Sequence, residues 1–261
     1  KMNVDAVVEG SVLSVEEPMR ITVRLISAVP ERQLWSNSYD RDFGDIFILS
    51  SEVARAIARE IEMTPTPEQE ALLAATRPVK RETLTAYLKG MFHLNKSTPE
   101  GTQKGLAYLH QAIEEDPADP LAYAGLALGY AASAHGPGAP SDALERAEAA
   151  ALKALELDDT LAEAHAALAH IKEYTDWDWE AAELAYQRAL RLNPTLTVTR
   201  AHYSFYLLLF GQTDEALAQM RRVQEMDPLT PLWPAWQGWL YWWAGQYEEA
   251  IDEARKSLEL D

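Results

Sequence analysis

Ala189-Leu-Arg-Leu-Asn-Pro194 ends a stretch of sequence that the chain repeats. Four related tails are Ala112-Ile-Glu-Glu-Asp-Pro117, Ala154-Leu-Glu-Leu-Asp-Asp159, Val223-Gln-Glu-Met-Asp-Pro228 and Ser257-Leu-Glu-Leu-Asp261. The last residues of the first four copies are 42, 35 and 34 residues apart. A period of about 34 residues is that of a unit made of two helices joined by a turn. The repeat therefore predicts an array of helical hairpins.

The first interval is longer because Ala134-His-Gly-Pro-Gly-Ala-Pro-Ser-Asp142 is inserted at the inner turn of one unit, where a loop can grow at little entropic cost. Small residues recur seven positions apart on the second helix of each unit, where two helices must approach closely. The pairs are Ala147 and Ala154, Ala182 and Ala189, Ala216 and Val223, and Ala250 and Ser257. A single amphipathic hairpin cannot bury its apolar face alone, so we expect neighbouring units to stack.

The first helices carry Tyr123, Leu126 and Ala127 in one unit and Gly238 and Tyr241 in another. With the small residues and terminal prolines, this pattern resembles the tetratricopeptide repeat (TPR) family. The resemblance implies a mainly α fold, a right-handed superhelix of about five repeats. The expected repeats are residues 82–117, 118–159, 160–194, 195–228 and 229–261, the last ending without a cap.

Residues 4–62 have a different composition. Ala6 to Leu13, Arg20 to Ala28 and Gln33 to Arg41 are short, β-branched or aromatic and partly alternating, which predicts three strands. The polar breaks between them favour an antiparallel meander. Apolar residues at steps of three and four after Asp45 predict one amphipathic helix. We therefore expect a small α+β domain at 1–63, and a linker at 64–81 that begins with the proline-rich breaker Met63-Thr-Pro-Thr-Pro-Glu.

This segment resembles the second half of a TolB-like amino-terminal domain, on the stretches VDAVVEGSV, LWSNSYDRDFGDIF and EVARAIAREI. Such domains stand beside TPR arrays in bacterial signalling proteins, fused to a winged-helix DNA-binding domain, a nucleotide cyclase or a protein kinase. The resemblance implies the sensory or scaffolding part of a regulator, in a chain that begins inside a domain. It leaves open the bacterial cytoplasm and the periplasmic side of an inner-membrane protein.

Composition excludes several classes of function. The formal charge is −18, and most of the acidic excess lies in residues 119–261. Nucleic-acid binding depends on Lys and Arg that neutralise phosphates, so we expect none in this region. The absence of cysteine removes thiolate chemistry and most structural zinc sites. No apolar run is long enough to cross a bilayer.

Catalytic motifs are also missing from the sequence. No two of the six histidines stand four apart as zinc ligands on one helix would, and Gly136-Pro-Gly138 does not follow a strand as a phosphate loop would. Asp176-Trp-Asp-Trp-Glu180 lacks the glycine of a calcium loop and reads as a turn between helices. We therefore expect no enzyme activity, no cofactor and no metal site.

The resemblance to TPR proteins places ligand contacts on the first helix of each repeat, along a concave groove. The residues at those positions are Tyr87 and Met91, His170, Glu173 and Tyr174, Phe205, Leu208 and Leu209, and Trp239, Trp242 and Trp243. They include no Lys or Arg, so the expected partner is a protein or peptide with apolar or aromatic anchors.

Two alternatives stay open at this point. The spacing of Trp233, Trp236, Trp239, Trp242 and Trp243 suits core packing as well as ligand contact. The sheet domain and the first repeat could instead form a small-ligand sensor that relays to an absent effector domain. An uncapped last repeat also predicts self-association through its apolar face.

Overall fold

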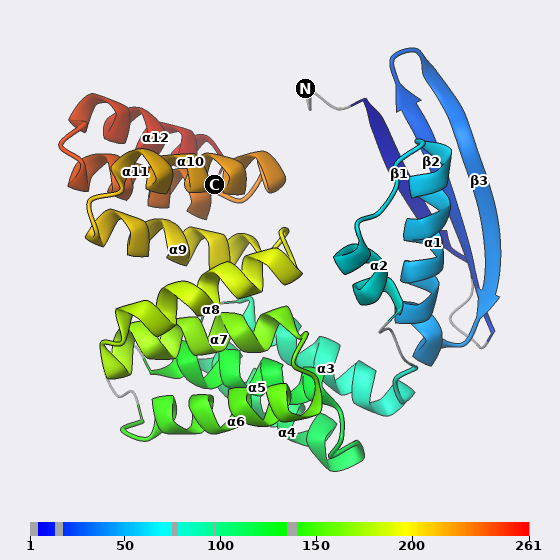
Figure 1. Ribbon diagram of the computed structural model, residues 1–261, viewed down its shortest axis with the longest axis horizontal. Helices are drawn as coiled ribbons and strands as arrows, with labels where there is room; N and C mark the ends of the chain where they lie inside the picture. The colour runs from blue at the N-terminus through cyan, green and yellow to red at the C-terminus, as the bar shows by residue number, and fades with distance from the viewer. Residues whose placement is uncertain (1–4, 14–17, 75–77, 97, 135–139, 261) are drawn as a thin grey trace. The chain divides into compact units, whose positions relative to one another are not determined.

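The computed structural model of the chain describes residues 5–13, 18–74, 78–96, 98–134 and 140–260. The chain forms two compact units, Lys1–Ala86 and Tyr87–Asp261, which Figure 1 draws as a sheet with two helices and a series of stacked helices. Helix α3 crosses from the first unit into the second. The mainly α fold with a small sheet at the amino-terminal end is thus confirmed.

The first unit contains an antiparallel sheet in the order β1-β2-β3. Its strands are β1 Ala6–Val12, β2 Met19–Ala28 and β3 Glu31–Arg41. The three predicted strands are therefore confirmed, with ends shifted by one or two residues. A short 3₁₀ turn, Phe43–Asp45, then leads into α1, Ile46–Glu60, which is the predicted amphipathic helix.

The two faces of β2 differ because its side chains alternate. Met19, Ile21, Val23 and Leu25 are buried, and three of them form a core with Leu49 of α1. An antiparallel sheet of this kind has one packed face and one solvated face.

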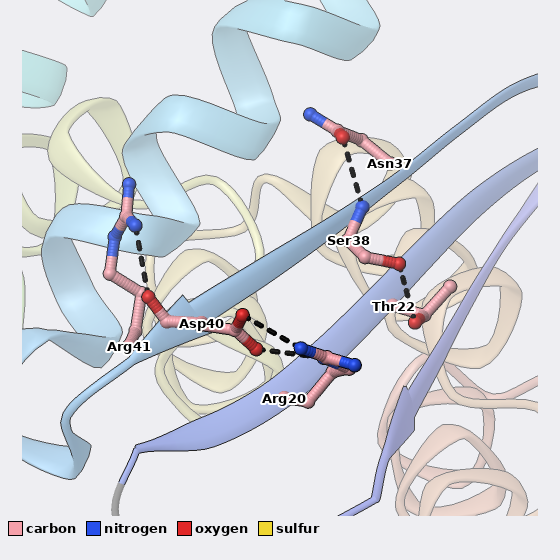
Figure 2. Close-up of polar contacts among 6 residues, drawn as sticks. All are labelled: Arg20, Thr22, Asn37, Ser38, Asp40 and Arg41. Atoms are coloured by element: carbon pink, nitrogen blue, oxygen red, sulfur yellow. Dashed lines mark hydrogen bonds and ion pairs between the residues drawn. The ribbon is translucent and has the colours of Figure 1, made fainter.

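Figure 2 shows the solvated face. Arg20 donates from Nε and Nη2 to the carboxylate of Asp40 at 2.8 and 2.9 Å. The hydroxyls of Thr22 and Ser38 lie 2.9 Å apart on the same pair of strands. Exposed pairs of this kind are screened by solvent, so the face fixes strand register more than it adds stability.

A further helix, α2 at Pro67–Ala74, lies inside the stretch expected as linker. Its start has the reciprocal bonds of a capping box. Gln69 N–H donates to Thr66 Oγ1 at 3.3 Å, and Thr66 N–H donates to Gln69 Oε1 at 2.8 Å. Pro67 suits the first helical position, where no N–H is needed. The proline-rich stretch that indicated a break therefore leads into a helix, which begins at Pro67.

The second unit is a series of five helical hairpins, whose first hairpin begins with α3 in the first unit. Their helices are α3 Arg81–Leu94 and α4 Pro99–Glu115; α5 Pro120–Ser133 and α6 Ala143–Leu157; α7 Ala162–Ile171 and α8 Trp179–Leu192; α9 Thr197–Leu209 and α10 Thr213–Met226; and α11 Leu232–Trp243 and α12 Tyr247–Leu260. A π-helical turn, Lys172–Asp176, extends α7. The first hairpin begins at Arg81, one residue before the expected repeat 82–117, and consecutive hairpins contact one another.

Small residues let these helices approach closely. Ala147, Ala154, Ala182 and Ala189 are fully buried, as their seven-residue spacing predicted. A Cβ added to Gly125 would lie 2.7 Å from a methyl carbon of Leu109. The helices therefore pack at a distance that larger residues would prevent.

The inner turns of the last three hairpins share a left-handed residue. Gly211 has φ of 74° and Gly245 has φ of 77°, and Trp177 takes the same conformation at 53° one repeat earlier. In the second hairpin the inserted loop, including His135 and Gly136-Pro-Gly138, lies mostly outside the described residues.

Candidate functional site

The first helices of the last three hairpins carry most of the residues predicted to bind a partner. Together α7, α9 and α11 contain one glutamate, Glu163, and one arginine, Arg200. The second helices are far richer in charge, and α12 alone has five carboxylates. The first helices therefore offer apolar and aromatic surface with charge placed elsewhere.

An aromatic strip runs across these three hairpins. It consists of Tyr174, His170, His202, Trp236 and Phe205. Successive ring centroids, taken in that order, lie 4.6, 5.1, 5.3 and 5.5 Å apart. The first pair is stacked and the other three meet edge to face, which are favourable geometries for rings. The strip therefore links α7, its π-helical turn, α9 and α11 through side chains.

The five clustered tryptophans differ in burial, and Trp236 is half-buried against the core of the last two hairpins. Trp233 is 4% exposed, and its Nε1 donates to Asp227 at 2.7 Å. Trp239, Trp242 and Trp243 are 63, 55 and 67% exposed. Trp233 is therefore a core residue. We call Trp239, Trp242 and Trp243 the outer tryptophans, and their exposed surface is open to a ligand.

The predicted residues of α9 also differ in exposure. Phe205 and Leu208 are half-buried and pack against the core between the fourth and fifth hairpins. Leu209 is exposed beside them in sequence. Phe205 and Leu208 are therefore held in place by packing, and Leu209 next to them in sequence is open to solvent.

Tyr87 and Met91 of the first hairpin stand apart from this set. Both lie against Gly125 of α5, at 3.2 and 3.3 Å from the position of an added Cβ. Burial raises the pKa of the Tyr87 hydroxyl well above its ordinary value. Their contacts are those of packing between hairpins, and nothing brings them together with the outer tryptophans.

Glu173 was expected on the groove, but it points into the core. It is 4% exposed and accepts a hydrogen bond of 2.6 Å from Tyr186 Oη on α8. Burial raises the pKa of this carboxyl, and the Tyr186 bond opposes part of that rise. The π-helical turn changes which side chains of this segment face inward, and a regular helical count could not anticipate it.

Sequence reasoning did not predict His202 as a member of the strip, and it left Trp236 open between core packing and ligand contact. They are 34 residues apart, so they occupy the same position in consecutive repeats. Equivalence across repeats was the signal that could have found them.

No group of three His, Asp or Glu side chains within the described part of the chain is placed to hold a metal ion. Among the described helices, none is both long and apolar enough to span a bilayer.

No family model matches the chain. A solved structure, TTC0263 from Thermus thermophilus, described as a thermophilic TPR protein, superposes with a TM-score of 0.56 at 18% identity. That match covers 68% of this chain and 91% of the other. The helical array has a TPR fold. This outcome confirms the fold that the repeat pattern implied for the array.

Two kinds of curated bacterial relative match the chain. Over 169 residues it is 28% identical to the transcriptional regulator HilA of Salmonella typhimurium, covering 64% of this chain and 30% of that protein. Over 128 residues it is 26% identical to the putative adenylate cyclase 3 of Rhizobium meliloti, covering 49% of this chain and 22% of that protein. The chain thus spans less than a third of the length of these relatives. The resemblance of residues 4–62 to a TolB-like domain stays a prediction.

Proposed function

We propose that the TPR array is a protein-interaction module of a bacterial signalling or regulatory protein. On this proposal it binds a polypeptide segment along the aromatic strip and the outer tryptophans. The observation that carries the proposal is the exposure of Trp239, Trp242 and Trp243 beside side chains already fixed by packing. Exposed tryptophans dominate binding energy when a partner covers them.

The chemistry of the partner follows from the surface. Aromatic or long aliphatic anchors suit the tryptophans, because the strip offers few charged groups to pair with. Lys or Arg beside those anchors suits the carboxylates of α12. The regulatory context is supported by the similarity to a transcriptional regulator and to a putative adenylate cyclase.

A peptide-display selection on the chain, followed by calorimetry on the selected peptides, tests this function. We expect peptides rich in aromatic and basic residues. In the double variant Trp239→Ala with Trp242→Ala, affinity falls at least about 30-fold, because the loss of even one hot-spot aromatic costs about 2 kcal/mol or more.

Tyr247→Ala is the matched control, since Tyr247 is an exposed aromatic residue of α12 outside the strip. This variant should leave affinity within about twofold, because substitutions on the surface outside an interface usually have small effects. If the double variant and the unchanged chain bound the peptides with equal affinity, the outer tryptophans would not be the binding site.

We propose self-association through α12 as a second use of the array. Ile251 and Leu258 are exposed, and because they stand seven residues apart they form an apolar stripe along one side of that helix. Two copies could cover each other's stripe. Sedimentation equilibrium should show a concentration-dependent dimer that Ile251→Glu abolishes; a monomer at all concentrations contradicts this.

A further inference from the structure

A cavity of about 300 Å³, open to solvent, lies between α8, α9 and α10. It is lined by Gln187, Leu190, Arg191, Arg200, Tyr203, Glu215 and Gln219. The volume is at the small end of ligand sites in proteins, so it suits a small molecule and not a protein segment.

Arg200 is the unusual member of this lining. The residue is 8% exposed, and its Nη2 donates to the carbonyl of Pro194 at 2.7 Å. Its Nη1 donates to Oε1 of Gln219. Its Nε is buried and has no hydrogen-bond partner among the described residues. The acceptors recorded for this guanidinium are thus neutral oxygens.

A buried cation without a carboxylate is costly, because neutral acceptors replace only part of its hydration. Burial and the nearby Arg222 both lower the pKa of Arg200, although an arginine stays charged at any physiological pH. The cavity therefore has an uncompensated positive charge in its wall.

The neighbouring charges do not cancel it. Arg191 lines the same cavity and is exposed. Glu215, the carboxylate of the lining, accepts from Nε2 of Gln219 at 2.6 Å. Two arginines thus face one glutamate, in a chain whose formal charge is −18.

The cavity is separate from the aromatic strip. At about 100° per residue, Arg200 and Tyr203 lie on the side of α9 opposite Phe205 and Leu209. A ligand in the cavity and a peptide on the strip therefore contact different surfaces of the same helix.

We propose that this cavity binds a small organic or inorganic oxyanion through Arg191 and Arg200. Guanidinium groups recognise carboxylate and phosphate oxygens with paired, charge-assisted hydrogen bonds. Leu190 gives the cavity an apolar wall, and the amides of Gln187 and Gln219, which donate to Glu183 and Glu215, line it as neutral polar groups. Carboxylate and phosphate share this chemistry, and titrations with each distinguish them.

The test is a pair of NMR titrations of the whole chain, one with sodium succinate and one with inorganic phosphate. Both are compared with sodium chloride at equal ionic strength. We expect saturable shifts of the Gln187 and Gln219 side-chain amide signals with at least one of the two anions. Arg191→Ala should weaken that binding by about tenfold or more, the loss typical of one charge-assisted hydrogen bond.

Arg221→Ala is the matched control, because Arg221 is exposed on α10 and does not line the cavity. It makes the same change in net charge and should leave the titration unaltered. Arg200→Met keeps the length of the buried side chain and should abolish binding; Arg191→Ala carries the test if Arg200→Met does not fold.

Two results overturn the proposal. One is the absence of saturable shifts with both anions. The other is equal weakening by Arg191→Ala and Arg221→Ala, which would mean that the anions respond to net charge and not to this cavity.

Discussion

At the residue scale, Trp177, Gly211 and Gly245 hold the same left-handed backbone at intervals of one repeat. Glycine takes this conformation without a steric penalty, whereas a residue with a Cβ loses about 1–2 kcal/mol. Trp177 bears that strain while remaining exposed, and its ring meets Trp179 edge to face at 5.5 Å. Strained backbone residues cluster at functional sites, so this turn is a candidate for contact with a partner.

Gly211→Ala should destabilise the chain by about 1 kcal/mol, because a Cβ at this φ is strained even where space is free. An added Cβ would meet no described atom within 4 Å, so the effect isolates the backbone. Urea denaturation measures the change. Gly10→Ala in β1, which also has free space but no positive φ, should not destabilise; equal losses at both sites contradict the explanation.

Glu173→Gln should raise the melting temperature at pH 7. Burial raises the pKa of Glu173 in the folded state, so folding favours the protonated carboxyl. The stability that this protonated form contributes is fully present below the unfolded pKa of about 4.5 and is lost as pH rises through the folded value. Glutamine stays neutral and keeps an oxygen for the Tyr186 bond.

Thermal scans between pH 4 and 8 check this prediction, and the gain should shrink toward zero below about pH 4.5. Glu225→Gln, an exposed carboxylate on α10, should change stability by no more than about 0.5 kcal/mol. A Glu173→Gln variant that is no more stable than the unchanged chain at pH 7 contradicts the burial argument.

At the element scale, α2 shows where local pattern misleads. The prolines of the Met63-Thr-Pro-Thr-Pro-Glu stretch predicted a break, yet Thr66 and Gln69 cap a helix at that point. Proline is unfavourable inside a helix and favourable at its first position, so one residue type supports opposite readings. The three-residue spacing of Thr66 and Gln69 is that of a capping box, and it could have distinguished a helix start from a break.

Thr66→Ala should remove about 1 kcal/mol of stability from α2, because the cap satisfies an amide at the helix start. Amide hydrogen exchange over residues 68–74 measures this loss locally. Thr64→Ala, two residues earlier and outside the helix, serves as the control. Unchanged exchange in the Thr66 variant would contradict the capping role.

The strands and hairpins were predictable because their periods are visible in the sequence. Met19, Ile21 and Val23 alternate with polar residues, and that alternation predicts that they share the buried face, which the structure packs against α1. The division of the tryptophans was not predictable. Residues three and four apart share one helix face, and only the packing of other helices decides which part of that face is covered.

At the scale of the whole molecule, stability of the array is a sum over neighbouring hairpins. Leu240 is fully buried in a core shared by the fourth and fifth hairpins. Leu240→Ala should cost about 2–5 kcal/mol by leaving a cavity there.

The loss should appear as faster hydrogen exchange in α9 to α12, while protection in the β1-β2-β3 sheet stays the same. Leu184→Ala, at an exposed position of α8 outside the proposed interfaces, should change neither. Uniformly faster exchange across both units would show that the chain unfolds as one cooperative body.

The separation of charge from apolar surface in the last hairpins has a kinetic consequence. On the proposed function, the carboxylates of the second helices would attract a basic partner over about one Debye length, so the association rate should fall with added salt. The outer tryptophans would act only after contact and would set how long the proposed complex lasts. Salt should therefore slow the arrival of a partner and leave its residence time nearly constant.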